Sequence, residues 1–138
     1  MPYRRLSPDL SQWTVQSLTR LTATYAILQG CGIVLGGRDR WGSQALRIAL
    51  AVPGAPASWG WVLLGLGVLA LALTFHRRSR GVLFAMLGIA SWSMFFAVAL
   101  TPTVVENGSR VATTGPLTYA FIAVTACVLG MAYRRSRP

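Results

Sequence analysis

Apolar residues in this chain gather into four long runs, and short polar or basic segments separate them. The runs cover residues 18–37, 59–75, 81–100 and 117–133. A helix of about 20 apolar residues crosses the hydrocarbon core of a bilayer, and it satisfies its own backbone hydrogen bonds there. Each run therefore predicts a transmembrane helix. The spans occupy most of the 138 residues, so we expect one all-α domain over 1–138, an integral membrane four-helix bundle.

The segments that connect the runs also contain patterns that predict local structure. Residues 45–52 are apolar but too few to cross a bilayer, and the sequence Pro-Gly-Ala-Pro follows them at 53–56. This pattern predicts a short interfacial helix between spans one and two, closed by a turn. Residues 76–80 are the only link between spans two and three, which predicts a tight antiparallel hairpin. In the connection 101–116, an Asn-Gly pair flanked by β-branched residues predicts a small β-hairpin.

The N-terminal segment contains a helix start signal. Ser7 is placed as N-cap, and Pro8 occupies the first helical position, where its missing N–H costs nothing. Leu10, Trp13 and Leu18 then fall near one helical face. We expect this segment to lie along the lipid headgroups before the chain turns inward as the first span.

Composition supports the membrane interpretation and excludes one class of partner. The chain holds 13 Lys+Arg against 3 Asp+Glu, a net charge of +10, yet only 12% of its residues are charged and its mean hydropathy is +0.52. Soluble domains carry about 25% charged residues. The basic residues flank apolar runs and do not form a basic face interleaved with aromatic residues, so nucleic acid is not expected as a partner. The expected partner is the lipid bilayer, including its anionic headgroups.

The arginines also predict an orientation. Four spans put both termini and residues 76–80 on one side, and this side holds more arginine than the other, which favours a cytoplasmic location for it. We therefore expect a multi-pass protein of the cytoplasmic membrane with both termini inside. The arginines on the cytoplasmic side would be Arg4, Arg5, Arg20, Arg77, Arg78, Arg80, Arg134, Arg135 and Arg137, against Arg38, Arg40, Arg47 and Arg110 outside. The residues expected to anchor the protein at the membrane interfaces are Trp41, Trp59, Trp61, Arg77, Arg78, Arg80, Arg134, Arg135 and Arg137.

Candidate chemistry is sparse. The carboxylates Asp9, Asp39 and Glu106 all fall outside the spans, and no ionisable residue is expected within one, which disfavours a proton-coupled exporter and an enzyme. His76 is the single histidine and has no Cys, Asp or Glu nearby, so no metal site and no cofactor are expected. The two cysteines sit inside apolar runs and are expected to pack there.

The most organised polar feature lies in the first span. Thr22, Tyr25, Gln29, Gly32 and Gly36 recur at spacings of 3, 4, 3 and 4, so they share one helical face, and the two glycines form a GxxxG pair. This stripe predicts either packing on a neighbouring helix, with Gln29 hydrogen-bonded across the contact, or the wall of a water-filled lesion built by several copies. Further faces of small residues occur in the third span, at Gly81, Ala85, Gly88 and Ser91, and in the fourth, at Ala123, Ala126 and Gly130.

One stretch of the chain resembles a known group of proteins. A glycine-rich span end is followed by a charged residue, an aromatic residue, a short apolar helix and a Pro-Gly-Ala-Pro turn into the next span. This order is similar to that in small multi-span, holin-like membrane proteins of actinobacterial phages. The matching positions are Gly36, Gly37, Arg40, Trp41, Pro53, Gly54, Ala55, Pro56, Ser58, Trp59 and Gly60.

The resemblance implies a non-enzymatic phage or prophage protein that forms homo-oligomers. Its expected role is that of a holin, which permeabilises the cytoplasmic membrane during lysis and so releases or activates a lytic enzyme. The alternative is an accessory protein that binds and modulates a host or phage membrane complex, for example in superinfection exclusion. The first role requires a membrane lesion, whereas the second requires only binding to another complex.

Overall fold

The chain folds as an arrangement of long helices. A computed structural model describes residues 8–36, 53–107 and 114–136, and within them it has helices α1 (Pro8–Gly36), α3 (Ala57–Phe75), α4 (Ser79–Asn107) and α5 (Thr114–Arg135). Each helix contains a stretch that is long and apolar enough to cross a membrane: Ser11–Gly36, Ala57–Phe75, Ser79–Thr101 and Gly115–Arg135. The prediction of an all-helical, four-span, multi-pass membrane protein is confirmed at this level.

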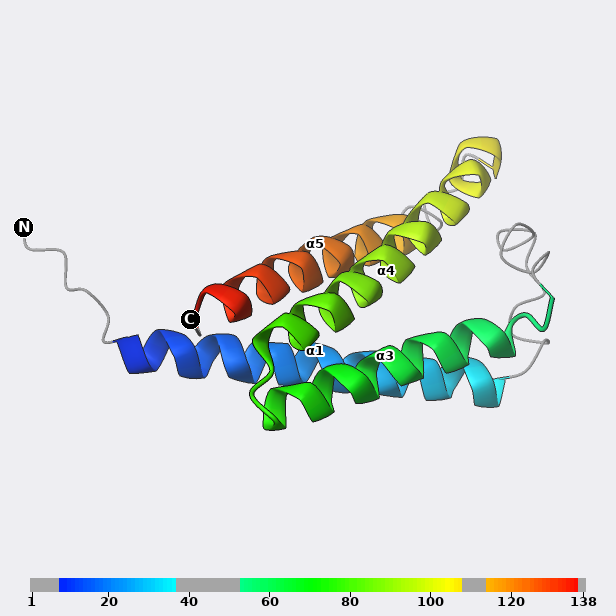
Figure 1. Ribbon diagram of the computed structural model, residues 1–138. Helices are drawn as coiled ribbons and strands as arrows, with labels where there is room; N and C mark the ends of the chain where they lie inside the picture. The colour runs from blue at the N-terminus through cyan, green and yellow to red at the C-terminus, as the bar shows by residue number, and fades with distance from the viewer. Residues whose placement is uncertain (1–7, 37–52, 108–113, 137–138) are drawn as a thin grey trace, which may run out of the picture.

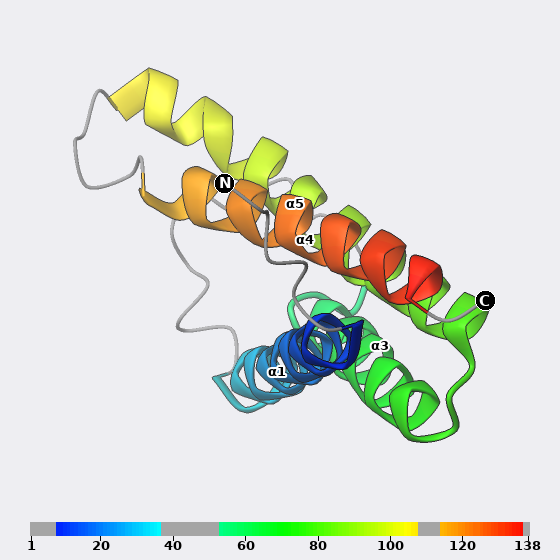
Figure 2. The same ribbon diagram turned by 90° about the vertical axis from the view of Figure 1, so that its left-hand side faces the viewer.

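The helices form two antiparallel pairs. α1 packs along α3, and α4 packs along α5 (Figure 1). Viewed from the left of Figure 1, α1 and α3 form the lower pair and α4 and α5 the upper pair (Figure 2). The pairs meet mainly where α3 packs on α4, while α1 and α5 contact each other less extensively. This arrangement leaves one side of the bundle, between α1 and α5, incompletely closed.

Small residues hold the first pair together. The buried positions of α1 and α3 repeat at alternating spacings of 3 and 4, so each set forms one face of its helix. They are Thr19, Ala23, Ala26, Gly30 and Ile33 on α1, and Gly60, Leu63, Gly67, Ala70 and Thr74 on α3. A Cβ atom at Gly30 would lie 2.7 Å from the Leu64 backbone nitrogen and 2.8 Å from the Gly60 carbonyl oxygen. The two backbones are therefore in direct contact, which is how helices associate where lipid offers no hydrophobic gain.

Small residues also allow close packing of α4 and α5, where they contact larger side chains. Ala123, Ala126 and Gly130 of α5 are buried, and a Cβ atom at Gly130 would lie 3.0 Å from the Cβ of Met86 and 3.3 Å from the Cδ1 of Leu83. These small residues pack within the molecule. On α4, positions 81 and 88 face leucine side chains of α3, at 2.9 and 2.7 Å from where their Cβ atoms would lie.

The connection after the third span differs from the prediction. Residues 101–107 are helical because α4 continues through Pro102 to Asn107, so a β-hairpin over 101–116 is wrong for this part. Extending an existing helix fixes only one residue for each hydrogen bond gained, and Pro102, which has no N–H, is the one residue of this stretch that gains none. The side chain of Thr101 also bonds within the helix, because its Oγ1 donates to the Ala97 carbonyl over 2.8 Å. The Asn-Gly turn itself lies partly outside the described residues.

The first helix also differs. It begins at Pro8, as predicted, but it runs unbroken to Gly36 and does not turn between a headgroup segment and a span. The physical reason lies at its N-terminal end, which packs on other parts of the bundle. Gln12 Nε2 donates to the Ser136 carbonyl over 2.6 Å, and Val15 packs against the core. The proposed cap, Ser7, lies outside the described residues.

The link between spans one and two is described only at its end. Residues 53–56 form the predicted turn, and Gly54 adopts a φ of +81°, which favours glycine. The Ser58 N–H donates to the Gly54 carbonyl over 3.1 Å and leads directly into α3. The interfacial helix expected at 45–52 and Trp41 lie outside the described residues.

Candidate functional site: the groove between α1 and α5

One end of the bundle is basic. The start of α1, the end of α3, the start of α4 and the end of α5 meet there (Figure 1). Hydrogen bonds from Gln12 to Ser136 and from the Tyr133 hydroxyl to the Thr74 carbonyl, 3.4 Å long, tie these helix ends together. The described arginines at this end are Arg20, Arg77, Arg78, Arg80, Arg134 and Arg135, and all except the half-buried Arg20 are exposed. Arg137 lies outside the described residues.

Arg20 corrects the expectation that no ionisable residue lies within a span. It belongs to the candidate span of α1, and its guanidinium carbon lies 4.7 Å from the centre of the Phe75 ring. Its Nε atom is buried and has no hydrogen-bond partner in the described structure. Because Phe75 is the last residue of α3, Arg20 lies at the level where that helix ends. A cation over an aromatic face at the edge of a span is far less costly than one at the bilayer centre.

The opposite end of the α3–α4 contact is aromatic. Trp59 stacks on Phe95 with ring centroids 4.9 Å apart, and Trp92 stacks on Phe96 at 4.2 Å. The Trp92 Nε1 donates to the Trp59 carbonyl over 3.2 Å, and Tyr119 of α5 joins the cluster at 5.8 Å from Phe96. This cluster joins three helices, and it includes a tryptophan that the sequence assigned to the membrane interface.

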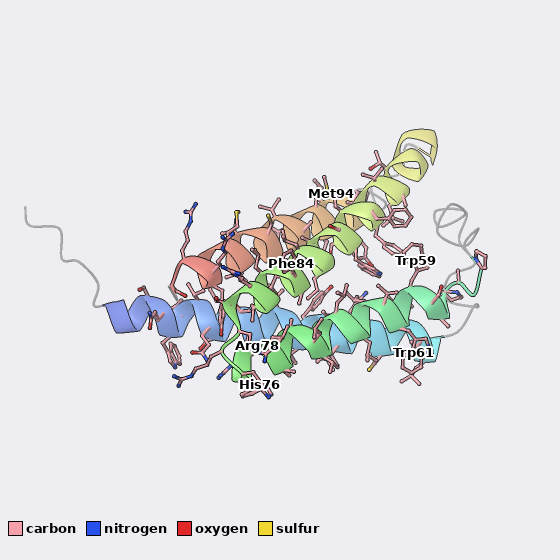
Figure 3. The ribbon with its side chains drawn as sticks, in the orientation of Figure 1. Trp59, Trp61, His76, Arg78, Phe84 and Met94 are labelled. Carbon is pink, nitrogen blue, oxygen red and sulfur yellow. The ribbon has the colours of Figure 1, made fainter. Side chains whose placement is uncertain are left out.

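Trp59 and Trp61 have different surroundings although both begin the same span. Trp59 is half-buried and lies toward α4, whereas Trp61 projects from the other side of α3 and is 59% exposed (Figure 3). Trp61 is therefore placed where it can contact lipid. Trp59 contributes to packing between helices.

The incompletely closed side of the bundle contains an open groove of about 380 Å³. Its walls are mostly apolar, and the Thr22 Oγ1 donates to the Leu18 carbonyl of its own helix over 2.9 Å. Beyond one end of the groove, Gln29 Nε2 donates to the Tyr119 hydroxyl of α5 over 3.5 Å. At the basic end, Gln12 of α1 bonds to Ser136, the residue that follows α5. The groove is lined by Leu21, Thr22 and Tyr25 of α1 and by Phe121, Ile122 and Thr125 of α5.

The groove contains part of the polar stripe recognised in the sequence. Thr22 and Tyr25 line it, and Gln29 contacts α5. Gly32 is exposed, and a Cβ atom there would meet nothing within 4 Å, while Gly36 is half-buried. The glycine of α1 that packs on α3 is Gly30, which the stripe does not include. The stripe thus runs along the edge of α1 that faces α5 and the surrounding membrane.

The groove is suited to binding apolar surface, not to acid–base chemistry. Its only titratable lining residue is Tyr25. Within the described ranges, no three His, Cys, Asp or Glu side chains lie close enough to hold a metal ion. His76 places its Nδ1 2.9 Å from the Ala72 carbonyl at the end of α3, and Cys31 and Cys127 are half-buried free thiols. An apolar helix face or an acyl chain matches these walls.

The Gln29–Tyr119 bond can be tested directly. Replacing Tyr119 with phenylalanine removes the acceptor, and we expect a loss of about 0.6 kcal/mol in the free energy of unfolding, the average for such bonds in membranes. A double-mutant cycle with Gln29→Leu, measured by SDS titration in bicelles, isolates the pair. Tyr25→Phe is the control, because it removes a tyrosine hydroxyl from the groove that lies next to this bond. Zero coupling between positions 29 and 119 would show that the bond does not stabilise the fold.

No family model, curated protein or solved structure matches this chain.

Proposed function

We propose that this protein is a non-enzymatic phage or prophage membrane protein that self-associates in the cytoplasmic membrane and acts as a holin. The observation that supports this most directly is the open space around Gly32. Gly30, two residues earlier on α1, packs directly on α3, whereas a Cβ atom at Gly32 would meet no described residue within 4 Å. Gly32 forms a GxxxG pair with the half-buried Gly36, and its open side is suited to close contact with another helix.

The neighbouring groove extends this surface. A second copy approaching α1 along the Gly32 side would meet Tyr25 and the apolar groove lining as well. Contact through such a surface needs no water-filled channel in the single molecule. Permeabilisation would follow when enough copies gather to exclude the lipid between them. A lytic enzyme could then cross the membrane through the resulting lesion.

The proposed orientation places both termini and residues 76–80 in the cytoplasm, since most of the arginines gather there. Single cysteines at positions 109 and 136, in a background lacking Cys31 and Cys127, test it. We expect an impermeant external reagent to label position 109 in intact cells and position 136 only after lysis. The reverse pattern would show that the protein is inverted.

Expression of the wild-type protein from an inducible promoter tests the proposed function. We expect an abrupt collapse of membrane potential after a delay, followed by lysis when a cytoplasmic endolysin is co-expressed. A potential-sensitive dye and culture turbidity report the two events. If cells at high expression keep their potential and the endolysin stays inside, the holin proposal is wrong. The accessory role in a host or phage membrane complex would then replace it.

A further inference from the structure

A second pocket lies at the basic end of the bundle, between α4 and α5. It has a volume of about 380 Å³ and is lined by Leu83 of α4 and by Met131, Arg134 and Arg135 of α5. In contrast to the α1–α5 groove, it combines apolar and charged walls. None of its residues belongs to the polar stripe on α1, so its role is separate from self-association through that helix.

The lining residues are ordered by depth. Met131 precedes Arg134 and Arg135 by three and four positions, so the three side chains share one face of α5. The candidate span of α5 ends at Arg135, which puts the guanidinium groups at the edge of the membrane and Met131 about one turn deeper. Leu83 supplies the apolar wall on α4, and the exposed Arg80 lies three positions before it. The pocket therefore changes from apolar to cationic along the membrane normal.

The end of α5 is held in place by contacts on both sides of Arg134 and Arg135. These contacts fix the backbone that carries the two arginine side chains. Tyr133, just before them, is 1% exposed, and its hydroxyl donates to the Thr74 carbonyl of α3. Ser136, just after them, donates its N–H to the Ala132 carbonyl over 3.0 Å and accepts the bond from Gln12 at its own carbonyl. Because the backbone is fixed on both sides, only the arginine side chains lose conformational entropy when they bind an anion. Guanidinium groups bind phosphate oxygens through paired hydrogen bonds.

We propose that this pocket binds one anionic phospholipid. The phosphodiester would lie against Arg134 and Arg135, with Arg80 adding charge at the rim, and an acyl chain would lie against Leu83 and Met131. Basic pockets between transmembrane helices are where anionic headgroups bind selectively. The apolar and cationic walls follow each other in the same order as the acyl chain and the phosphate of a phospholipid. A free phosphate ion would not need the apolar wall.

Native mass spectrometry of the full chain, titrated with phosphatidylglycerol or phosphatidylcholine, tests the proposal. We expect one tightly retained phosphatidylglycerol per chain and a weakening of roughly tenfold in R134Q/R135Q. R77Q/R78Q is the matched control, because it removes the same charge from exposed arginines at the same end that do not line the pocket. Its affinity should stay within about twofold of wild type. Met131→Ser, at a side chain 44% exposed, should also weaken binding by removing part of the apolar wall.

Three results would overturn the proposal. Equal loss in the two double variants would show that lipid responds only to the overall charge of the basic end. Equal retention of phosphatidylcholine would show that the pocket does not select an anionic headgroup. Displacement of the lipid by inorganic phosphate at matched concentration would show that the arginines bind free anions and that the apolar wall contributes nothing.

Discussion

Replacing Gly30 with leucine should separate α1 from α3 and lower the free energy of unfolding by about 3 kcal/mol or more, the upper end of the cost of overpacking. A Cβ atom at this position would lie within 2.9 Å of the backbone nitrogen and Cα of Leu64 and of the Gly60 carbonyl oxygen. These are backbone atoms, which cannot rotate away as a side chain can. The helices must move apart, and the other close contacts of the pair, such as Gly67 against the Ala23 carbonyl, are then lost as well.

SDS titration in bicelles, followed by tryptophan fluorescence, measures this loss. Gly65→Leu is the matched control, because it adds the same side chain to α3 at a position where a Cβ atom meets nothing within 4 Å. We expect the control to change the free energy of unfolding by no more than about 0.5 kcal/mol, as exposed substitutions usually do. Equal unfolding of wild type and Gly30→Leu would contradict the close packing of α1 on α3.

The positions of the spans could be predicted from the sequence because the bilayer sets them. Span length follows from membrane thickness, and each residue contributes its hydropathy independently of the fold. The second span, expected at 59–75, is Ala57–Phe75 in the structure, and the fourth, expected at 117–133, is Gly115–Arg135. The first span is the exception, since it begins at Ser11, within a polar stretch where Gln12 bonds to Ser136, just after α5.

The choice between neighbouring glycines could not be predicted as readily. Gly32 and Gly36 attract attention as a GxxxG pair, yet Gly30 is the glycine that packs on α3. In an apolar span every face is hydrophobic, so hydrophobicity does not mark the buried one. The usable signal is the recurrence of small residues at 19, 23, 26 and 30, matched by 60, 67, 70 and 74 on the partner helix. Such a repeat identifies the packing face only when the partner helix is known.

Contacts between distant segments explain the remaining differences between the structure and the sequence-based predictions. Trp59 lies at the start of a span, a position typical of an interfacial anchor, but its ring contacts Phe95 and Phe96 of α4. Phe96 in turn contacts Tyr119 of α5. Their proximity depends on how α3, α4 and α5 pack together. The apolar groove has the same origin, since it lies between two distant hydrogen bonds, from Gln29 to Tyr119 and from Gln12 to Ser136. Local patterns of 3 or 4 residues contain no information on such contacts.

The Gly32 side of α1 supports a functional prediction of comparable size. If copies of the protein meet there, replacing both Gly32 and Gly36 with leucine should weaken association roughly tenfold and delay or abolish lysis, because the added side chains prevent close approach of the helices. Gln29→Leu should change the timing less, since it removes one hydrogen bond to Tyr119. Onset of depolarisation and crosslinked oligomer in membranes are the measurements.

Gly65→Leu separates this effect from a general change of the lipid-facing surface. It adds a leucine in open space, as the change at Gly32 does, but on α3 and away from the groove. We expect Gly65→Leu to lyse cells on the wild-type schedule, with all variants at equal abundance in the membrane and with equal resistance to SDS. A delay of the same length in Gly65→Leu would show that lysis does not depend on the α1 face. Unchanged timing in the double variant would lead to the same conclusion, because the copies would then have to meet through another helix.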